Sequence, residues 1–354
     1  MATDRSSYRA RGAAVVACLT AVLAASLLSA CDSDPKPDSA TAARTVDLQA
    51  HRGGRGLTTE ESLAGFTKAI ELGVSTLELD IVLTKDAVPL IWHDPIVLDT
   101  KCADTVPTFP DDPQFPYVGK VIHDLTAAQV HTLDCGEPLA DFPGQQAISG
   151  NRIATLPELF ALTASRAAAL RYNIETKIEA DKPEQSASPQ EFVEVILRAV
   201  AAAGQTPNVE IQSFDWRTLR SVREANPSVP LVALYDDTTF VSDSRWLGPV
   251  RYEDHPGDPI GAIKALGADI AAPGYSVPYG RKAGQPGFTL VADKAYVERA
   301  HAAGLRVVPW TVNDKATIAA QLDTGVDGVI TDYPDRMREV LRDKGMPLPK
   351  AYPR

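Results

Sequence analysis

Charged side chains stand at the ends of three apolar runs in this sequence. They form the motifs His51-Arg52-Gly53, Glu78-Leu79-Asp80 and Asn173-Ile174-Glu175-Thr176-Lys177. Short apolar runs of this kind are typical of buried β-strands. In a strand, side chains two positions apart point to the same side, so Glu78 faces with Asp80, and Glu175 faces with Lys177. A buried charge at such a position needs a partner or a ligand.

The three carboxylates predict a metal site. Glu78, Asp80 and Glu175 offer oxygen ligands, which suit Mg²⁺, Ca²⁺ or Mn²⁺ better than Zn²⁺. Without a cation, three carboxylates in one pocket would repel one another strongly. We expect one divalent cation, Ca²⁺ or Mg²⁺. Ca²⁺ is slightly favoured, because the N-terminus described below indicates export and an exported enzyme meets ample calcium.

Two cations and two histidines could complete the chemistry. Arg52 presents a planar fork that matches phosphate oxygens, and Lys177 adds a second positive charge. His51 and His93 titrate near neutrality, as a general acid and a general base must. With a metal, these groups predict cleavage of a phosphoryl ester. Taken singly, the motifs also fit a surface histidine–arginine pair, a solvated strand edge or a weak local ion pair.

The chain alternates strand-like and helical segments from about Val46 onward. The predicted strands are Val46–Ala50, Thr76–Ile81, Tyr172–Thr176, Val209–Ser213, Pro230–Leu234, Asp269–Ala272, Arg306–Trp310 and Gly328–Thr331. Helical periodicity falls at Ser62–Leu72, Leu156–Ala164, Glu191–Ala203, Trp216–Ala225, Ile260–Leu266, Ala292–Ala303 and Lys315–Asp323. The alternation predicts an α/β fold, a single (β/α)₈ TIM barrel with its active site at the C-terminal rim. A doubly wound sheet is the alternative, but no Gly-x-Gly-x-x-Gly follows the first strand.

One apolar run and one long segment interrupt this rhythm. Val88–Trp92 follows its preceding strand too closely for a parallel crossover, so we expect a hairpin that returns His93 to the same end of the sheet. Residues 99–152 form an insertion bracketed by Cys102 and Cys135, and loops of that length are usually functional or stapled. A second long loop, Tyr235–Pro259, has no assigned role.

The N-terminus has the features of a lipoprotein signal peptide. Arginines precede an apolar run that ends in Leu28-Ser29-Ala30-Cys31, which resembles a bacterial lipobox. We therefore expect residues 1–31 to be the signal with Cys31 lipidated, 32–44 a flexible tether, 45–340 the barrel and 341–354 a C-terminal tail. The protein would be exported and lipid-anchored on the outer face of the cell membrane, or secreted. A transmembrane anchor is the alternative, at the short end of the spanning range.

Cysteine use and charge add two expectations. Outside the signal only Cys102 and Cys135 remain, and in an oxidising compartment they are expected to form a disulfide. The net charge of −11 argues against general nucleic-acid binding, but it permits a small anionic substrate.

The motifs together resemble the glycerophosphodiester phosphodiesterase family. The resemblance is carried in order by His51-Arg52-Gly53, Thr59-Glu60-Glu61-Ser62, Leu77-Glu78-Leu79-Asp80, Trp92-His93-Asp94-Pro95, Ile174-Glu175-Thr176-Lys177, Gln212-Ser213-Phe214-Asp215, Pro309-Trp310-Thr311-Val312-Asn313 and Gly325-Val326-Asp327-Gly328 through Pro334. It implies a barrel that hydrolyses glycerophosphodiesters to glycerol 3-phosphate and an alcohol.

Roles for single residues follow from the same resemblance. It implies that His51 and His93 are the acid/base pair and that Glu78, Asp80 and Glu175 hold the metal. Arg52 and Lys177 would contact phosphate, and Trp310 would line the glycerol side. Where the family usually reads Pro-Glu-Asn, this chain has Thr59-Glu60-Glu61, so Glu60 is expected near the metal or hydrogen-bonded to Arg52.

Two other functions stay open at this point. One is a phospholipase D or C that acts on lysophospholipids or phospholipids, with the insertion and the 235–259 loop gripping acyl chains. The other is a non-catalytic barrel that binds a ligand, although none of the expected metal or histidine positions is lost. His123, His131, His255 and His301 stand outside any motif. The sequence predicts no oligomeric state.

Overall fold

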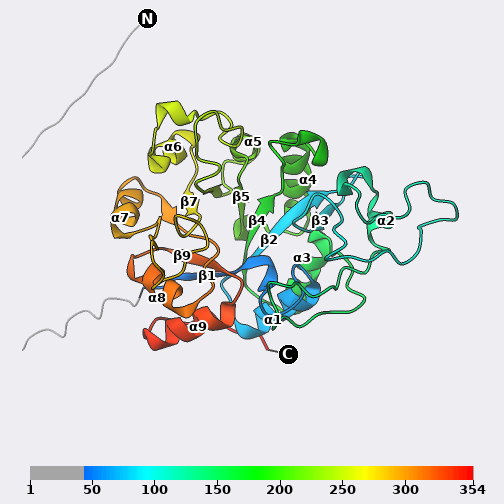
Figure 1. Ribbon diagram of the computed structural model, residues 1–354, viewed down its shortest axis with the longest axis horizontal. Coiled ribbons are helices and arrows are strands. Elements are labelled where there is room, and N and C mark those ends of the chain that lie inside the picture. Colours follow the sequence, from blue (N-terminus) through cyan, green and yellow to red (C-terminus); the bar gives the residue numbers. More distant parts are fainter. Residues whose placement is uncertain (1–43, 354) are drawn as a thin grey trace, which may run out of the picture. The chain divides into compact units, whose positions relative to one another are not determined.

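Eight parallel strands form a nearly closed barrel in the computed structural model, which describes residues 44–353 (Figure 1). The strands are β1 (Asp47–Ala50), β2 (Thr76–Leu83), β4 (Arg171–Thr176), β5 (Val209–Ser213), β6 (Leu231–Tyr235), β7 (Ile270–Pro273), β8 (Arg306–Val307) and β9 (Gly328–Thr331). β1 pairs with β2 and β9, and the other neighbours follow chain order. Backbone hydrogen bonds from Asp327 N to Val307 O (2.9 Å) and Ile330 N to Pro309 O (3.0 Å) close the ring. The predicted (β/α)₈ barrel is confirmed.

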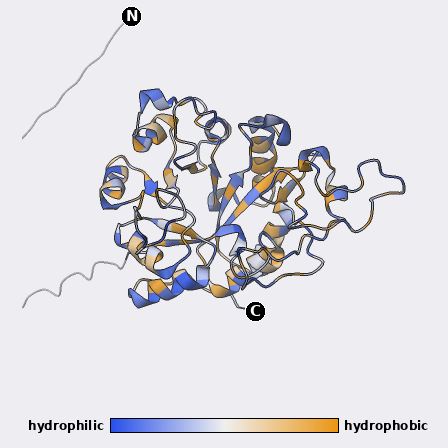
Figure 2. Cartoon of the chain, in the orientation of Figure 1, coloured by the Kyte–Doolittle hydropathy of each residue, from blue (hydrophilic) through white to orange (hydrophobic). Residues whose placement is uncertain are grey.

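A helix follows each parallel strand and packs outside the barrel. These helices are α1 (Leu63–Leu72), α3 (Leu156–Ser165), α4 (Pro189–Ala202), α5 (Trp216–Ala225), α6 (Pro259–Leu266), α7 (Lys294–Ala302), α8 (Lys315–Asp323) and α9 (Pro334–Asp343). Several begin at a residue whose side-chain oxygen accepts an amide hydrogen of the first turn, as Thr155 does from Glu158 N. Figure 2 shows apolar residues concentrated in the strands and on parts of the helices, as expected of amphipathic covering helices.

Helix α9 was not among the predicted helices. Its arginines and acidic residues dilute the apolar signal, yet Met337, Val340 and Leu341 are buried against the core. The helix runs past residue 340, so the segment expected to be a tail begins inside it. The residues after α9 turn back onto the barrel, where Tyr352 N donates to Ile70 O at 3.1 Å.

The interior of the barrel is polar on one side and apolar on the other. On the β1–β5 side, Asn173 donates to Gln49 at 2.8 Å and to Gln212 at 2.9 Å, all three being fully buried. The β6–β9 side is filled by an apolar cluster consisting of Val232, Leu234, Ile270, Ala272, Val308 and Ile330. Buried amides require partners, so the polar side forms a connected network that reaches up to the site described below.

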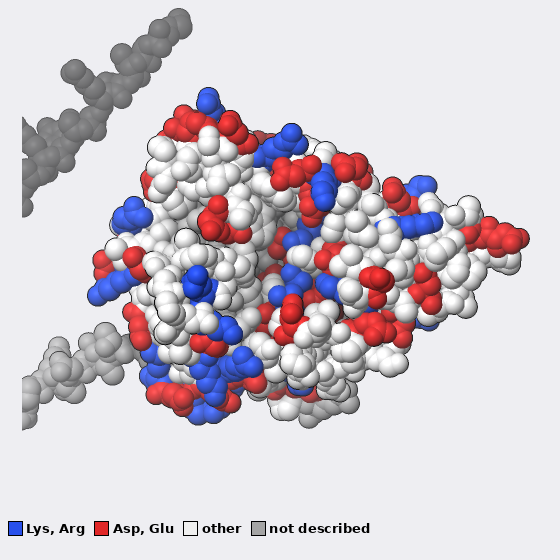
Figure 3. All heavy atoms as spheres, viewed as in Figure 1, with Lys and Arg blue, Asp and Glu red and all other residues white. Residues whose placement is uncertain are grey.

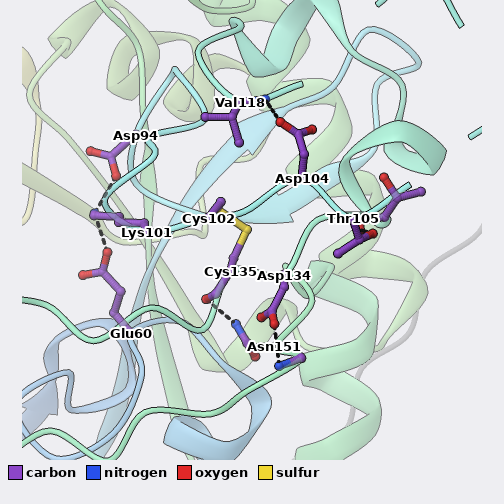
Figure 4. Close-up of a disulfide and its surroundings, with 12 residues drawn as sticks. Glu60, Asp94, Lys101, Cys102, Asp104, Thr105, Val118, Asp134, Cys135 and Asn151 are labelled. Atoms are coloured by element: carbon purple, nitrogen blue, oxygen red, sulfur yellow. Dashed lines mark hydrogen bonds and ion pairs between the residues drawn. A yellow bond between two sulfur atoms is a disulfide. The ribbon is translucent and has the colours of Figure 1, made fainter. Parts of the chain in front are cut away.

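A short hairpin leads into the insertion. Strand β3 (Pro89–Ile91) pairs antiparallel with β2, with Ile81 opposite Ile91, as the sequence predicted. The insertion extends beside this hairpin and contains the short helix α2 (Ala127–Val130), as Figure 1 shows. It shares a small core with the hairpin, in which Tyr117, Ile122 and Leu133 cluster with Val82, Leu90 and Trp92. The Cys102–Cys135 disulfide, drawn in Figure 4, belongs to the same cluster.

Both cysteines are expected to be oxidised in the purified protein. Each is only 2% exposed, and the disulfide joins segments 33 residues apart in the insertion. Thiol labelling of the unreduced, denatured protein should therefore modify neither Cys102 nor Cys135. After reduction both should react, and this serves as the positive control. Two reactive thiols before reduction would contradict the prediction.

The expected signal peptide at 1–31, its Cys31 and nearly all of the expected tether at 32–44 lie outside the described residues. Among residues 44–353, no helix is long and apolar enough to span a bilayer.

Candidate active site

The three predicted metal ligands converge at the C-terminal end of neighbouring strands. Glu78 and Asp80 project from β2 and Glu175 from β4, where Asp80 and Glu175 are paired in register. One carboxylate oxygen from each residue lies within 4.8 Å of the others, and all three residues are buried. Glu78 and Asp80 lie together because side chains two positions apart in a strand share a face. The pairing of β2 with β4 brings Glu175 beside them.

Each carboxylate is held by a different neighbour. Glu78 accepts hydrogen bonds from Gln212 Nε2 (2.6 Å) and from the backbone N of Arg52 (2.8 Å). Asp80 lies 2.9 Å from Arg52 Nε, and Glu175 accepts from Lys177 Nζ at 2.8 Å. These contacts fix the acidic cluster in one arrangement before any ligand arrives.

The electrostatics of the cluster are compatible with a bound cation. Burial and the charge of Asp80 raise the pKa of Glu78 well above its usual value. Burial also raises the pKa of Glu175 to about 8, although Lys177 opposes the shift. For Asp80, burial is outweighed by Arg52 and Lys177, so its pKa is lowered.

Asp80 also has free ligand capacity. Its Oδ1 is buried and has no hydrogen-bond partner among the described residues. A hard divalent cation would satisfy this oxygen and relieve the repulsion between the carboxylates, so the residues present fit such an ion.

Arg52 lies at the centre of the charged groups. Its backbone is left-handed (φ +50°), which turns its N–H toward Glu78 and its side chain toward Asp80. Its Nη1 donates to Glu60 Oε2 at 3.2 Å. Of the two placements expected for Glu60, near the metal or hydrogen-bonded to Arg52, the structure has the second. Burial raises the pKa of Glu60, but Arg52, Lys101 and Arg55 outweigh it and lower the pKa to about 2.

His51 is oriented by an aspartate from the other end of the chain. Its Nδ1 lies 2.5 Å from Asp332 Oδ1, and its Nε2 points toward Glu78, 4.0 Å from Oε2. Asp332 is itself held by Arg55 Nε and Asn313 Nδ2, each at 2.7 Å. Burial lowers the pKa of His51, and Asp332 opposes that shift.

His93 has the same kind of support from a neighbouring carboxylate. The hairpin places it there, and its Nδ1 lies 3.0 Å from Asp94 Oδ1. Burial, followed by the charges of Arg52 and Lys177, lowers the pKa of His93 to about 3. In both imidazoles Nδ1 lies beside a carboxylate, which leaves Nε2 as the ring nitrogen that could exchange a proton with a ligand.

These groups surround one cavity of about 120 Å³. Its lining comprises His51, Arg52, Arg55, Glu78, His93, Glu175, Lys177, Gln212, Phe214, Leu234, Tyr279, Trp310, Thr311 and Ile330. Phe214 and Tyr279 each pack against Trp310 with ring centres 5.2 Å apart, which makes an aromatic wall. Figure 3 shows acidic and basic atoms meeting in a hollow near the middle of the face drawn.

A second cavity of about 440 Å³ adjoins the first and shares Tyr279 and Thr311 with it. Its lining mixes aromatic residues with charges of both signs, namely Asp141, Phe142, Tyr275, Tyr279, Gly280, Lys282, Thr311, Asn313, Asp314, Tyr333 and Arg336. Because Asn313 bonds to Asp332, this cavity lies on the His51 side of the site.

The residue-level prediction omitted several groups that hold the site. Asp332, Gln212, Arg55, Asp94 and Lys101 all bond directly to a predicted site residue or to the carboxylate that supports it. Asp332 carried a usable signal, because a charged residue directly follows the apolar strand β9. Arg55 and Lys101 lie in loops, and nothing local distinguishes them.

A comparison with known families agrees with this geometry. The sequence profile described as "Glycerophosphoryl diester phosphodiesterase family" matches residues 51–336, which include every strand of the barrel after β1. The chain belongs to this family. It is accordingly an enzyme, a phosphoric diester hydrolase with glycerophosphodiester phosphodiesterase activity, and not a barrel that only binds.

Individual relatives support the assignment along most of the chain. A glycerophosphodiester phosphodiesterase from Caldanaerobacter subterraneus is 25% identical over 84% of this chain and 98% of its own length. A lysophospholipase D from Homo sapiens is 24% identical over 83% of this chain and 85% of its own.

Two solved structures share the barrel. One, from Silicibacter pomeroyi and of the same family name, has a TM-score of 0.69 at 26% identity, over 86% of this chain and 95% of its own. The other is an Oleispira antarctica phosphodiesterase in complex with the product sn-glycerol-3-phosphate. It has a TM-score of 0.60 at 18% identity, over 84% of this chain and 96% of its own, and at that identity it shows the fold alone.

Proposed function

We propose that the enzyme hydrolyses glycerophosphodiesters to glycerol 3-phosphate and an alcohol with one divalent cation and two catalytic histidines. The observation that carries this proposal is a buried cluster of three carboxylates, two of which line one cavity together with two cations and two imidazoles. Phosphodiester cleavage needs these elements: charge neutralisation at the phosphate, an activated water and a protonated leaving group.

Glu78, Asp80 and Glu175 would hold the cation, Ca²⁺ or Mg²⁺, with Ca²⁺ slightly favoured for an exported enzyme. When bound, the ion supplies a Lewis acid that polarises the phosphate. Arg52 and Lys177 line the same cavity and bind phosphate oxygens, which fixes the diester for attack in line with the leaving oxygen.

The two histidines divide the proton transfers. His93 Nε2 takes a proton from the attacking water, whose oxygen bonds to phosphorus as the bond from phosphorus to the alcohol oxygen breaks. His51 Nε2 gives a proton to that alcohol oxygen. We assign the acid to His51 because the larger cavity, which has room for the departing alcohol, lies on its side. The bound anionic phosphate favours the protonated imidazole that this role requires.

The glycerol would lie against the aromatic wall that includes Trp310. An acyl chain extends from the glycerol in a lysophospholipid, and here it would meet Trp310 with Phe214 packed edge to face and Tyr279 packed at a tilt against it. The second cavity, with Lys282, Asp314 and Arg336, suits a polar head group. These features favour a soluble glycerophosphodiester as the substrate. They argue against a lysophospholipid, the substrate class of the lysophospholipase D activity named for the human relative.

Release of glycerol 3-phosphate from glycerophosphocholine tests this function. Lysophosphatidylcholine carries the same head group and differs by its acyl chain, so it is the matched comparison. We expect kcat/KM to be about tenfold or more higher for glycerophosphocholine. An acyl chain would meet the aromatic wall beside the glycerol, and a single methylene group that a pocket does not accommodate is worth about 1–3 kcal/mol. Equal or reversed preference would favour the lysophospholipase reading, and no release from either would refute the proposal.

We also propose that the enzyme is exported and anchored to the outer face of the membrane through lipidated Cys31. The support is the charged start, the apolar run and the Leu-Ser-Ala-Cys sequence. The Cys31→Ala variant should then leave the membrane fraction, and its full retention there would refute the anchor.

A further inference from the structure

Lys101 bridges two carboxylates at the edge of the site. Its Nζ lies 2.5 Å from Glu60 Oε1 and 2.5 Å from Asp94 Oδ2 (Figure 4). The side chain is 14% exposed and Glu60 is 3% exposed, so the Lys101–Glu60 contact is mostly shielded from water. Such a pair differs from an exposed ion pair, because removing one partner leaves a buried charge without compensation.

Each of these two carboxylates also contacts a residue of the proposed mechanism. Glu60 accepts from Arg52 through its other oxygen at 3.2 Å, and the other oxygen of Asp94 lies 3.0 Å from His93 Nδ1. Lys101 is not among the described residues that line the cavity. It therefore lies behind the cavity wall, where it connects two groups that face the cavity, Arg52 and His93, through their carboxylate partners.

The backbone at Lys101 adjoins the disulfide. The amides of Lys101 and Cys102 both donate to Leu98 O, at 3.1 and 2.9 Å. Beyond Cys102, Ala103 and Asp134 exchange two backbone hydrogen bonds of 2.8 and 3.1 Å, and Cys102 is bonded to Cys135. The disulfide thus ties the residue beside Lys101 to the returning segment of the insertion.

We propose that Lys101 is a positioning residue, which sets the imidazole of His93 and the guanidinium of Arg52 relative to one another, and that the Cys102–Cys135 disulfide holds Lys101 in place. The inference rests on the proposed function, since it takes its meaning from the roles of His93 and Arg52. A residue that orients catalytic groups affects the chemical step more than substrate binding. The insertion then helps, through Lys101, to orient the catalytic groups.

Kinetics of Lys101 variants test the first half. Lys101→Met should lower kcat about tenfold or more, the usual cost of losing a group that orients a ligand or base, with a smaller change in KM through Arg52. Lys101→Arg can still bridge both carboxylates and should recover most of kcat. Lys120→Met is the matched control, because Lys120 lies in the same insertion and its Nζ bonds only to Gln114 among the described residues.

The outcomes separate positioning from simple anchoring. If Lys101→Met lowers the melting temperature but keeps the wild-type kcat, Lys101 only anchors the insertion and the proposal is wrong. If Lys101→Met does not fold, Lys101→Gln decides in the same way, because it keeps hydrogen-bonding capacity and loses only the charge and some length. A wild-type enzyme that releases no glycerol 3-phosphate would instead refute the proposed function.

A double-mutant cycle tests the second half. The double variant Cys102→Ala/Cys135→Ala, which lacks the disulfide, should also have a lower kcat than the wild type. In that background Lys101→Met should cost clearly less than in the wild type, because contacting groups that act as one unit are not additive. An equal cost in both backgrounds would overturn the role given to the disulfide.

Discussion

Excess chelator is expected to abolish hydrolysis of glycerophosphocholine, and added Ca²⁺ or Mg²⁺ should restore it. The reason is the buried cluster of Glu78, Asp80 and Glu175, whose oxygens lie within 4.8 Å of one another. Arg52 and Lys177 each already pair with a member of this cluster, so they cannot neutralise the carboxylates and the phosphate together. Oxygen ligands prefer hard cations, so Zn²⁺ alone should not restore activity.

Glu175→Gln provides the sharper form of this test. The substitution removes one negative charge while keeping the shape of the side chain, so metal affinity should fall by about tenfold or more. Calorimetric titration of the chelated protein with Ca²⁺ measures this directly, without reference to turnover. Glu210→Gln is the matched control, because Glu210 is a buried strand glutamate at the opposite end of the barrel, where it pairs with Arg306. It should cost stability but leave metal affinity unchanged.

Full activity in excess chelator, or rescue by Zn²⁺ only, would contradict the proposed metal site. Unchanged Ca²⁺ affinity in Glu175→Gln would remove this residue from the ligand set.

His51→Ala and His93→Ala should each lose about a hundredfold or more in kcat while the fold is retained, because each removes a proton-transfer group that faces the cavity. His301→Ala is the control. His301 is exposed on α7 and pairs with Asp327, which precedes β9 at the other end of the barrel. Near-UV circular dichroism of all three variants would show whether the tertiary packing survives.

A substrate with an activated leaving group separates the two roles. A glycerophosphodiester of p-nitrophenol needs no protonation of the departing oxygen, so His51→Ala should recover much of its rate on this substrate. His93→Ala should stay slow on both substrates, because activation of water is still required. The reverse pattern would exchange the acid and the base, and normal turnover in either variant would remove that histidine from the mechanism.

Local sequence patterns were enough to predict the fold and to name most of the candidate residues. Alternating apolar strands and amphipathic helices are local patterns, so the barrel and the hairpin at Val88–Trp92 could be predicted from short windows. Helix α9 was missed for the same reason, since its many charges mask the buried face formed by Met337, Val340 and Leu341. Strand β8 is shorter than predicted, but Val308 N and Trp310 N still donate to the β7 segment.

The contacts that orient the site residues could not be predicted in this way, because they join segments that are far apart in the sequence. His51 is oriented by Asp332, 281 positions away, because closure of the barrel puts the end of β9 beside the end of β1. Gln212 reaches Glu78 across the barrel interior, and Lys101 joins Glu60 to Asp94 only because the insertion folds back over the rim. Residue type and local spacing specify which side chains end a strand. The contacts that orient those side chains depend on pairing between distant segments, which no local pattern encodes.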